Sequence, residues 1–336
     1  MIKGHNVVKF IILCLLLIAT ACSKDEQAES NDESVLVRVM FNPAGLGDLS
    51  YNDNILKGIL QKQKELNFRL QYVCPEDEKE ETELIRYWQQ EAVVNKQYVV
   101  LVGDQLRTPA LEISPAATVR DYLLCDMDLK DSHAPIFRFC GYGVSFLAGI
   151  AAHAVTGSDS AVYIAAKPDD NYLEDAYKGF RDGFLYAGGK KVPQLFVATG
   201  SDGFNNPTRG YALADSLFRL YPFIYAMAGG TNTGVYKYLR DHPGLKCYTA
   251  GVDADQSIYS DRIIGSMIKD VGGCTGEYIE RWMRGEEIPM WQYVDLRSEF
   301  IYFQVSEGYR SRLEHLIDEK EQVAIEKEIK YVREYR

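Results

Sequence analysis

Hydrophobic and polar positions follow each other along this chain in two kinds of block. Short apolar runs such as 35–41 are typical of strands that are buried on both faces. Longer segments such as 52–66 have apolar residues three or four positions apart, which predicts amphipathic helices. The predicted strands are 35–41, 68–73, 98–102, 121–126, 136–139, 160–165, 194–198, 223–228 and 247–251. The predicted helices are 52–66, 80–91, 144–156, 173–187 and 210–221, with one more between the last two strands and one in the polar tail 307–336.

The order of these blocks indicates the fold class. Strands that alternate with amphipathic helices favour parallel sheets joined by right-handed crossovers. A chain of 336 residues exceeds what a single core of this kind usually holds, so we expect an α/β protein of two domains.

The first residues form a separate segment. Lys3 and Lys9 precede an apolar stretch at 10–20, and small residues lead up to Cys22. This order is typical of a basic region, a hydrophobic region and a cleavage site, and it resembles the bacterial lipoprotein signal, in which the cysteine becomes the lipid-bearing first residue. The apolar stretch is short for a membrane span, although an uncleaved membrane anchor is the alternative.

The signal therefore predicts an extracytoplasmic, membrane-anchored lipoprotein, in the periplasm or on the cell surface. We expect residues 1–21 to be removed and Cys22 to carry the lipid. The acidic, polar segment 22–34 has the composition of a solvated tether. Acidic residues directly behind the lipid-bearing cysteine also resemble a surface-export signal of some Gram-negative lipoproteins.

Charge and motifs exclude several classes of function. The net charge of −11 at pH 7 repels phosphates, so nucleic acid is not an expected partner. No GxxxxGK[ST] motif occurs, and the glycines at 141–143 are not continued into a dinucleotide fingerprint. The cysteines form no CxxC pair and the histidines show no ligand spacing, so we expect neither a metal site nor a cofactor.

Polar and aromatic residues gather directly after the predicted strands. Binding sites in such folds lie at the carboxyl ends of strands. The loops that follow strands are 45–53, Asp126 with Asp128, 203–207, 229–234 and 251–256. Taken singly, an aspartate such as Asp126 is more often a helix or turn cap, Tyr51 is as readily a core residue, and Lys269 is more often solvated. The interpretation as a ligand site rests on their convergence.

Four of these stretches resemble a known family. GLGDLSYND at 45–53, SFLAGIAA at 145–152, AGGTNTGV at 228–235, and GVDADQ at 251–256 followed by SMIK at 266–269 look like the basic membrane protein family. Its members are substrate-binding lipoproteins of ABC importers with a type I periplasmic-binding-protein fold, and characterised members bind purine nucleosides. The resemblance implies two Rossmann-like lobes joined by a hinge of three crossings.

The resemblance also implies a set of ligand-binding residues. The set is Asp48, Ser50, Tyr51, Asn52, Asp126, Phe204, Gly229, Gly230, Asp253 and Lys269. Tyr51 and Phe204 are the two aromatic residues that would sandwich a base, and Asp253 is the aspartate expected to bind ribose. The chain departs from the family pattern at Tyr51, where phenylalanine is commoner, and at Gly143, where an acidic residue is common. The stretches 104–109 and 167–172 and the charged C-terminal helix also depart from it.

These expectations give a complete hypothesis. One lobe holds 35–138 plus 254–285 and the other holds 139–253 plus 286–336, with crossings near Arg138, Asp253 and Glu286. The function is capture of a guanosine- or inosine-like nucleoside for import through an ABC permease, without catalysis. The alternatives are a surface receptor of the same fold for another small ligand, and a nucleoside hydrolase that uses the paired carboxylates at 126/128 and 253/255.

Overall fold

The computed structural model describes residues 35–42, 45–47, 51–92, 97–114 and 122–335. The predicted signal and tether, with Cys22, lie outside these residues, as do Asp48 and Ser50. Residues 35–336 form one compact unit with its own hydrophobic core.

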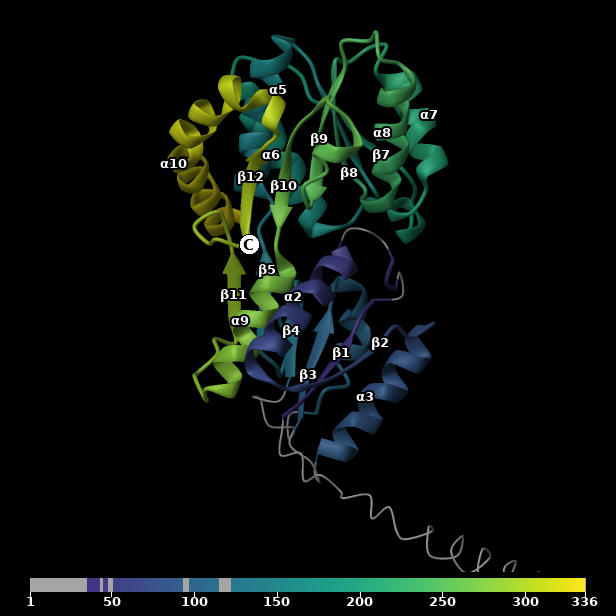
Figure 1. Ribbon diagram of the computed structural model, residues 1–336, viewed down its shortest axis with the longest axis vertical. Helices are drawn as coiled ribbons and strands as arrows, with labels where there is room; N and C mark the ends of the chain where they lie inside the picture. Colours follow the sequence, from purple (N-terminus) through teal and green to yellow (C-terminus); the bar gives the residue numbers. More distant parts are fainter. Residues whose placement is uncertain (1–34, 43–44, 48–50, 93–96, 115–121, 336) are drawn as a thin grey trace, which may run out of the picture. The chain divides into compact units, whose positions relative to one another are not determined.

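Two six-stranded sheets organise the described residues (Figure 1). The first sheet has the order β11-β5-β4-β3-β1-β2, with β1 (Leu36–Met40), β2 (Arg69–Val73), β3 (Gln97–Val102), β4 (Tyr122–Cys125), β5 (Ile136–Phe139) and β11 (Trp291–Val294). The second has the order β12-β10-β9-β8-β6-β7, with β6 (Val162–Ala165), β7 (Gln194–Phe196), β8 (Phe223–Met227), β9 (Tyr248–Asp253), β10 (Ile263–Lys269) and β12 (Ile301–Val305). All neighbouring strands are parallel except β10 and β12, which confirms the predicted α/β class.

Helices cover each sheet, and we call each sheet with its helices a lobe. The first lobe has α2 (Tyr51–Leu66), α3 (Glu78–Ala92), α4 (Arg107–Ala110) and α9 (Val271–Met283). The second has α5 (Tyr142–Thr156), α6 (Asn171–Tyr186), α7 (Pro207–Leu217), α8 (Asn232–Asp241) and α10 (Arg310–Tyr335). Neighbouring residues of β1 point to opposite faces of the first sheet, so Val39 belongs to a core with Ile55 of α2 while Met40 packs with Trp88 of α3.

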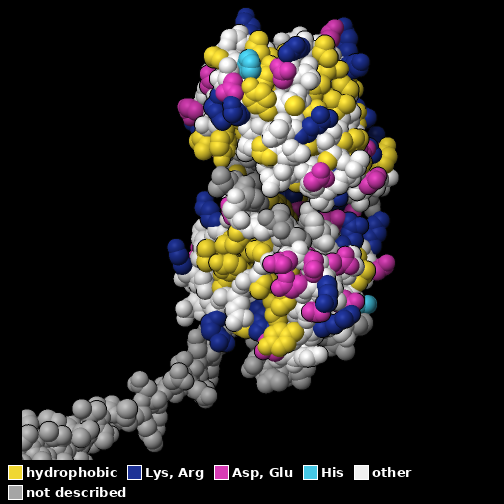
Figure 2. All heavy atoms as spheres, turned by 90° about the vertical axis from the view of Figure 1, so that its right-hand side faces the viewer, with side chains coloured by type: hydrophobic (Ala, Val, Ile, Leu, Met, Phe, Trp, Pro, Cys, Tyr) yellow, Lys and Arg dark blue, Asp and Glu magenta, His cyan; other side chains and the backbone are white. Residues whose placement is uncertain are grey.

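The surface carries many charged groups. Figure 2 shows Asp and Glu side chains gathered on one part of the face that it presents. Among the described helices, none is long and apolar enough to cross a membrane.

Within the described residues the chain passes between the two sheets three times. The passages follow β5, β10 and β11, so the predicted crossing near Arg138 lies next to the first of them. The second and third passages come later than the predicted positions at Asp253 and Glu286. The physical reason is that β10 continues the second sheet as the parallel neighbour of β9 instead of returning to the first lobe. The strand β11, which was not predicted, then pairs with β5 in the first sheet.

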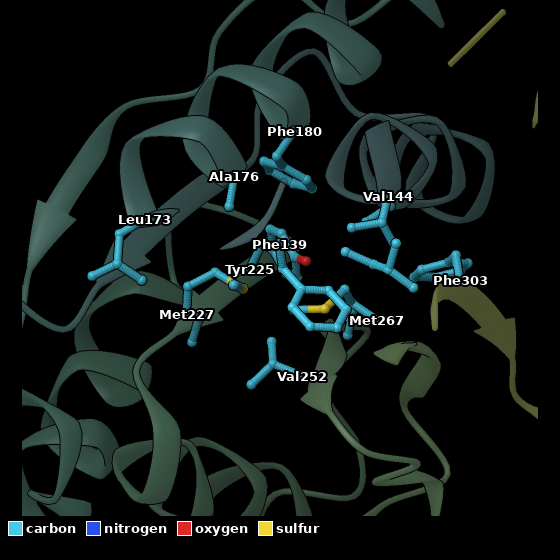
Figure 3. Packing of buried hydrophobic residues seen from close by; sticks show 14 of the residues in the cluster. Phe139, Val144, Leu173, Ala176, Phe180, Tyr225, Met227, Val252, Met267 and Phe303 are labelled. Atoms are coloured by element: carbon cyan, nitrogen blue, oxygen red, sulfur yellow. The ribbon is translucent and has the colours of Figure 1, made fainter. Parts of the chain in front are cut away.

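The second-lobe core is built from aromatic and aliphatic side chains of α5, α6 and the sheet. Figure 3 shows part of this cluster, with Val144, Leu173, Ala176, Phe180, Tyr225, Met227, Val252, Met267 and Phe303, together with Phe139 from β5 of the first lobe. The rings of Phe180 and Tyr225 lie 4.8 Å apart between their centroids. The helices α5 and α6 approach so closely that a Cβ at Gly179 would overlap the carbonyl oxygen of Tyr142.

We expect Gly179→Ala to destabilise the protein by about 1–3 kcal/mol, because the added methyl group forces the backbones of α5 and α6 apart. The measurement is urea unfolding of residues 23–336. The control is Gly308→Ala, since a Cβ at Gly308 would meet no atom within 4 Å and its backbone needs no positive φ. Equal stability of the two variants would contradict the close packing of these helices.

Candidate ligand-binding site

Asp126 lies directly after β4 of the first sheet. Its carboxylate contacts Lys269, the last residue of β10 in the second lobe. The Asp126 backbone is left-handed, with φ 54°, a conformation that aspartate tolerates better than most residues. The amide of Phe139 donates to Asp126 Oδ1 at 3.2 Å, and the hydroxyl of Tyr51 donates to Oδ2 at 3.0 Å. Lys269 Nζ also lies 2.5 Å from Oδ2. The carboxylate is therefore held by groups from both lobes.

Lys269, the last residue of β10, is 5% exposed and its ammonium group is surrounded by aromatic rings. Its Nζ lies 3.8 Å from the ring centroid of Tyr172, 5.0 Å from that of Tyr51 and 5.7 Å from that of Phe139. A cation over aromatic faces is stabilised by the ring quadrupoles, and more so where water is excluded. These contacts, with the ion pair to Asp126, place an aromatic and charged cluster where the two lobes meet.

Asp253 ends β9 and also has a left-handed backbone, with φ 65°. Its electrostatic effect reaches the same cluster. Burial raises the pKa of Tyr51 well above its ordinary value, and the charges of Asp126 and, less strongly, Asp253 raise it further. For Tyr172 the main cause of a raised pKa is again burial, followed by the charges of Asp253 and Asp126. Both phenols therefore remain protonated at neutral pH and act as hydrogen-bond donors, Tyr51 to Asp126 and Tyr172 to the sulfur of Met267.

A second group of predicted residues lies at the ends of β7 and β8. Phe204 closes the short helix η2 (Ser201–Phe204), and Gly229 begins η3 (Gly229–Thr231). Gly229 has φ 52°, and a Cβ there would lie 3.1 Å from the carbonyl oxygen of Phe204. A Cβ at Gly230 would lie 3.2 Å from Asn205 Oδ1. The structure thus brings Phe204 and the two glycines together in the second lobe.

Asn52 has a different place from the other predicted residues. Its side chain is 1% exposed and donates to the carbonyl oxygen of Gly45 at 2.7 Å and to Asn42 Oδ1 at 3.2 Å. Asn42 donates back to Asn52 Oδ1 at 3.1 Å. These bonds tie α2 to the loop that follows β1, so they position the neighbouring Tyr51.

The carboxylates that pair in sequence with Asp126 and Asp253 have other partners. Asp128 Oδ2 accepts from Asn171 Nδ2 at 2.6 Å and lies 3.4 Å from Arg138 Nη1. Asp255 accepts from the amide of Ser257 at 3.0 Å. Among the described residues no group of three or more His, Cys, Asp or Glu side chains is arranged to hold a metal ion.

Sequence reasoning missed Tyr172 and Phe139. Asp170 caps α6 by accepting from the amides of Tyr172 and Leu173, which fixes Tyr172 in the first turn of the helix. The same rule that selected Asp126 would have selected Tyr172, because it follows the carboxyl end of β6.

Two surface cavities, of about 320 and 580 Å³, lie along α9 and share a lining of Glu277, Arg281, Glu299 and Phe300. None of the predicted site residues lines either of them. At the junction of the lobes the ammonium group of Lys269 lies over the rings of Tyr172 and Tyr51 instead.

Comparison with known proteins identifies the family. Residues 35–334 match the model of the Bmp family, described as ABC transporter substrate-binding protein PnrA-like. The chain belongs to the Bmp family. It is similar to basic membrane protein C of Borreliella burgdorferi strain N40, with 25% identity over 81% of each chain. It is also similar to an uncharacterized lipoprotein of Pyrococcus horikoshii, with 25% identity over 78% of this chain and 67% of that one.

A solved structure supports the fold. The Bmp-family chain superimposes on an ABC transporter solute-binding protein from Aeropyrum pernix with a TM-score of 0.70 and 19% identity, covering 90% of this chain and 86% of that one. This confirms the predicted type I periplasmic-binding-protein fold. The protein is thus an ABC transporter substrate-binding protein, a class that binds small solutes outside the cytoplasm, and its relatives are solute-binding proteins rather than enzymes.

Proposed function

We propose that this Bmp-family protein captures a purine nucleoside of the guanosine or inosine type between its two lobes for import. The observation that carries the proposal is the Asp126 carboxylate, placed beside Tyr51 and reached from the second lobe by Lys269. An ionised carboxylate only accepts hydrogen bonds. It therefore favours a base edge rich in N–H groups, which guanine and hypoxanthine present.

The aromatic residues suit a flat ligand. Tyr51 belongs to α2 of the first lobe and Phe204 to the second lobe, so a base stacked between them would couple binding to closure of the lobes. Each aromatic pair contributes about 1 kcal/mol beyond the area that it buries. Tyr172, which was not predicted, adds a third ring beside Lys269.

Asp253 and the glycines suit the sugar. A carboxylate that accepts from both ribose hydroxyls makes charge-assisted bonds worth roughly 1.5–3 kcal/mol each, which discriminates against deoxyribose. Gly229 and Gly230 have no side chain, so a ligand can approach their backbone closely.

Lys269 balances the site before the ligand binds. The Lys269 ammonium neutralises Asp126. A nucleobase that donates hydrogen bonds to the Asp126 carboxylate replaces one of the groups that now contact it. Lys269 is then available for the sugar or for Asp253. The net charge of −11 favours an uncharged nucleoside over its phosphates.

Isothermal titration of residues 23–336 tests this function. We expect guanosine and inosine to bind, adenosine to bind more weakly, and guanosine monophosphate to bind least. No heat with any nucleoside would remove the ligand assignment and leave the family and the fold intact.

We further propose that Cys22 carries the lipid that holds the protein at the membrane. Relatives named as lipoproteins support this, together with the order of basic, apolar and small residues before Cys22. We expect Cys22→Ser to release the protein from the membrane fraction into the soluble fraction and to abolish labelling with radioactive palmitate. A Cys14→Ser variant is the control, and equal labelling of the Cys22→Ser and Cys14→Ser proteins would contradict the assignment.

A further inference from the structure

The C-terminal helix α10 returns to the segments through which the chain passes between the lobes. Glu328 of α10 is 1% exposed. The amide of Gly143, at the start of α5 after the first passage, donates to Glu328 Oε1 at 2.8 Å. The amide of Leu296, inside the third passage, donates to Oε2 at 2.9 Å. One buried carboxylate therefore holds the backbone at two of the three passages, with bonds stronger than those between neutral groups.

Gly143 leaves just enough room for this contact. A Cβ at position 143 would lie 2.7 Å from Glu328 Oε2 and 2.9 Å from Cδ, closer than real Cβ atoms approach other groups. The carboxylate reaches the first turn of α5 only because position 143 has no side chain. Neither the nucleoside hypothesis nor the fold class requires this pairing of residues far apart in sequence.

Tyr331, one turn further along α10, reaches the same region. Its ring stacks on Tyr142 with 4.5 Å between centroids, and its hydroxyl donates to Asp175 Oδ1 at 2.7 Å. Asp175 of α6 also accepts from Arg138 Nη2 at 2.9 Å. Since Arg138 belongs to β5 of the first lobe, this buried chain of contacts links α10 to both lobes at the hinge.

We propose that α10 is a clasp on the hinge, and that Glu328 is a positioning residue that holds the passages in the closed arrangement and so sets ligand affinity without touching the ligand. The assignment requires only that the protein binds its solute between two lobes. It holds whatever that solute is.

The charge state of Glu328 supplies a readout that a purely structural side chain lacks. Burial raises the pKa of Glu328 to about 7, against the opposing effect of its bonds to Leu296 and Gly143. The ionised carboxylate accepts from both amides, whereas protonation turns one oxygen into a donor and weakens one of the two bonds. The cost of burying the charge outweighs this bond, because the folded pKa lies above the ordinary 4.5, so release of the clasp becomes easier as pH rises through about 7.

Several other groups face this carboxyl. They are Cys140 on the first passage, Tyr142 on α5, and Asp295 with its partner Arg297 on the third passage. The free energy of unfolding changes with the same sign. Because the folded pKa lies above the ordinary 4.5, its contribution to stability is full below pH 4.5 and is lost as pH rises through about 7.

Hydrogen–deuterium exchange on ligand-free residues 23–336 tests the clasp. The variants are Glu328→Gln, Gly143→Ala, which expels the carboxyl without removing it, and Glu326→Gln, an exposed control on the same helix. At pH 5.5, where the wild-type clasp is tightest, we expect both clasp variants to exchange about tenfold or more faster in 140–146 and 294–301 than the wild type, after correction for intrinsic rates. Small-angle X-ray scattering should show a larger radius of gyration for them than for the control.

The pH arm separates positioning from folding. Wild type and Glu326→Gln should lose protection in 140–146 and 294–301 as pH rises from 5.5 to 8.5, after correction for intrinsic rates, and Glu328→Gln should not change. Equal exchange in Glu328→Gln and Glu326→Gln, or the same pH response in Glu328→Gln as in wild type, would overturn the proposal. If Glu328→Gln does not fold, Gly143→Ala decides the matter, and wild-type protection in that variant overturns the proposal.

Discussion

Asp126→Asn is expected to lower the affinity for guanosine about 10- to 100-fold, because it replaces a charge-assisted acceptor with an amide that presents donors toward the base edge. The loss should be smaller for adenosine, whose ring nitrogen N1 is an acceptor and can receive a bond from the new amide. Titration calorimetry of both nucleosides against wild type and variant measures the change in preference.

The matched control for this substitution is Asp131→Asn, which removes one carboxylate at an exposed position a few residues further along the chain. It should leave both affinities unchanged. An equal loss of affinity for guanosine and adenosine in Asp126→Asn would show that the carboxylate does not discriminate between the two bases.

Lys269→Met is expected to lower the free energy of unfolding by about 3–5 kcal/mol at pH 7, since it leaves the Asp126 charge without its buried partner. The two side chains are 5% and 9% exposed, so water replaces the lost ammonium poorly. Urea unfolding is the measurement, and the double variant Asp126→Asn/Lys269→Met should recover most of the loss.

The control for the lysine is Lys237→Met, whose partner Asp241 lies one turn away on α8 with the lysine 59% exposed. An exposed pair of this kind contributes about 0.3–0.5 kcal/mol. If Lys269→Met were no more destabilising than Lys237→Met, the junction of the lobes would not depend on the pair formed by Asp126 and Lys269.

The α/β class follows from the sequence because burial on both faces of a parallel sheet leaves a local signature. The apolar run that becomes β3 (Gln97–Val102) is buried throughout, and such a run is visible without any knowledge of its neighbours. The positions of Asp126 and Asp253 follow too, because the carboxyl end of a strand is fixed by chain direction.

Which of the two sheets a strand joins could not be predicted from the sequence in the same way. The run that forms β10 carries Gly265 and Ser266 at its centre, which obscured it as a strand, and its register shifts there against β9. Whether β10 remains in the second sheet or crosses to the first depends on pairing between distant strands. Local pattern contains no information about that choice, and the second and third passages were misplaced for this reason.

Contacts between distant segments were also out of reach. The bond between Gly143 and Glu328 joins residues 185 positions apart, and no local pattern indicates it. Tyr172 was similarly missed as a neighbour of Lys269, because the direction of a side chain in the first turn of a helix depends on the cap and on packing.

A crystal structure of residues 23–336 grown with guanosine tests the central claim most directly. The account predicts the base between Tyr51 and Phe204, with its N1–H group within hydrogen-bond distance of Asp126 and the ribose hydroxyls at Asp253. A nucleoside bound away from Asp126, or a closed protein in which Asp126 and Lys269 remain paired beside an empty junction at saturating guanosine, would contradict it.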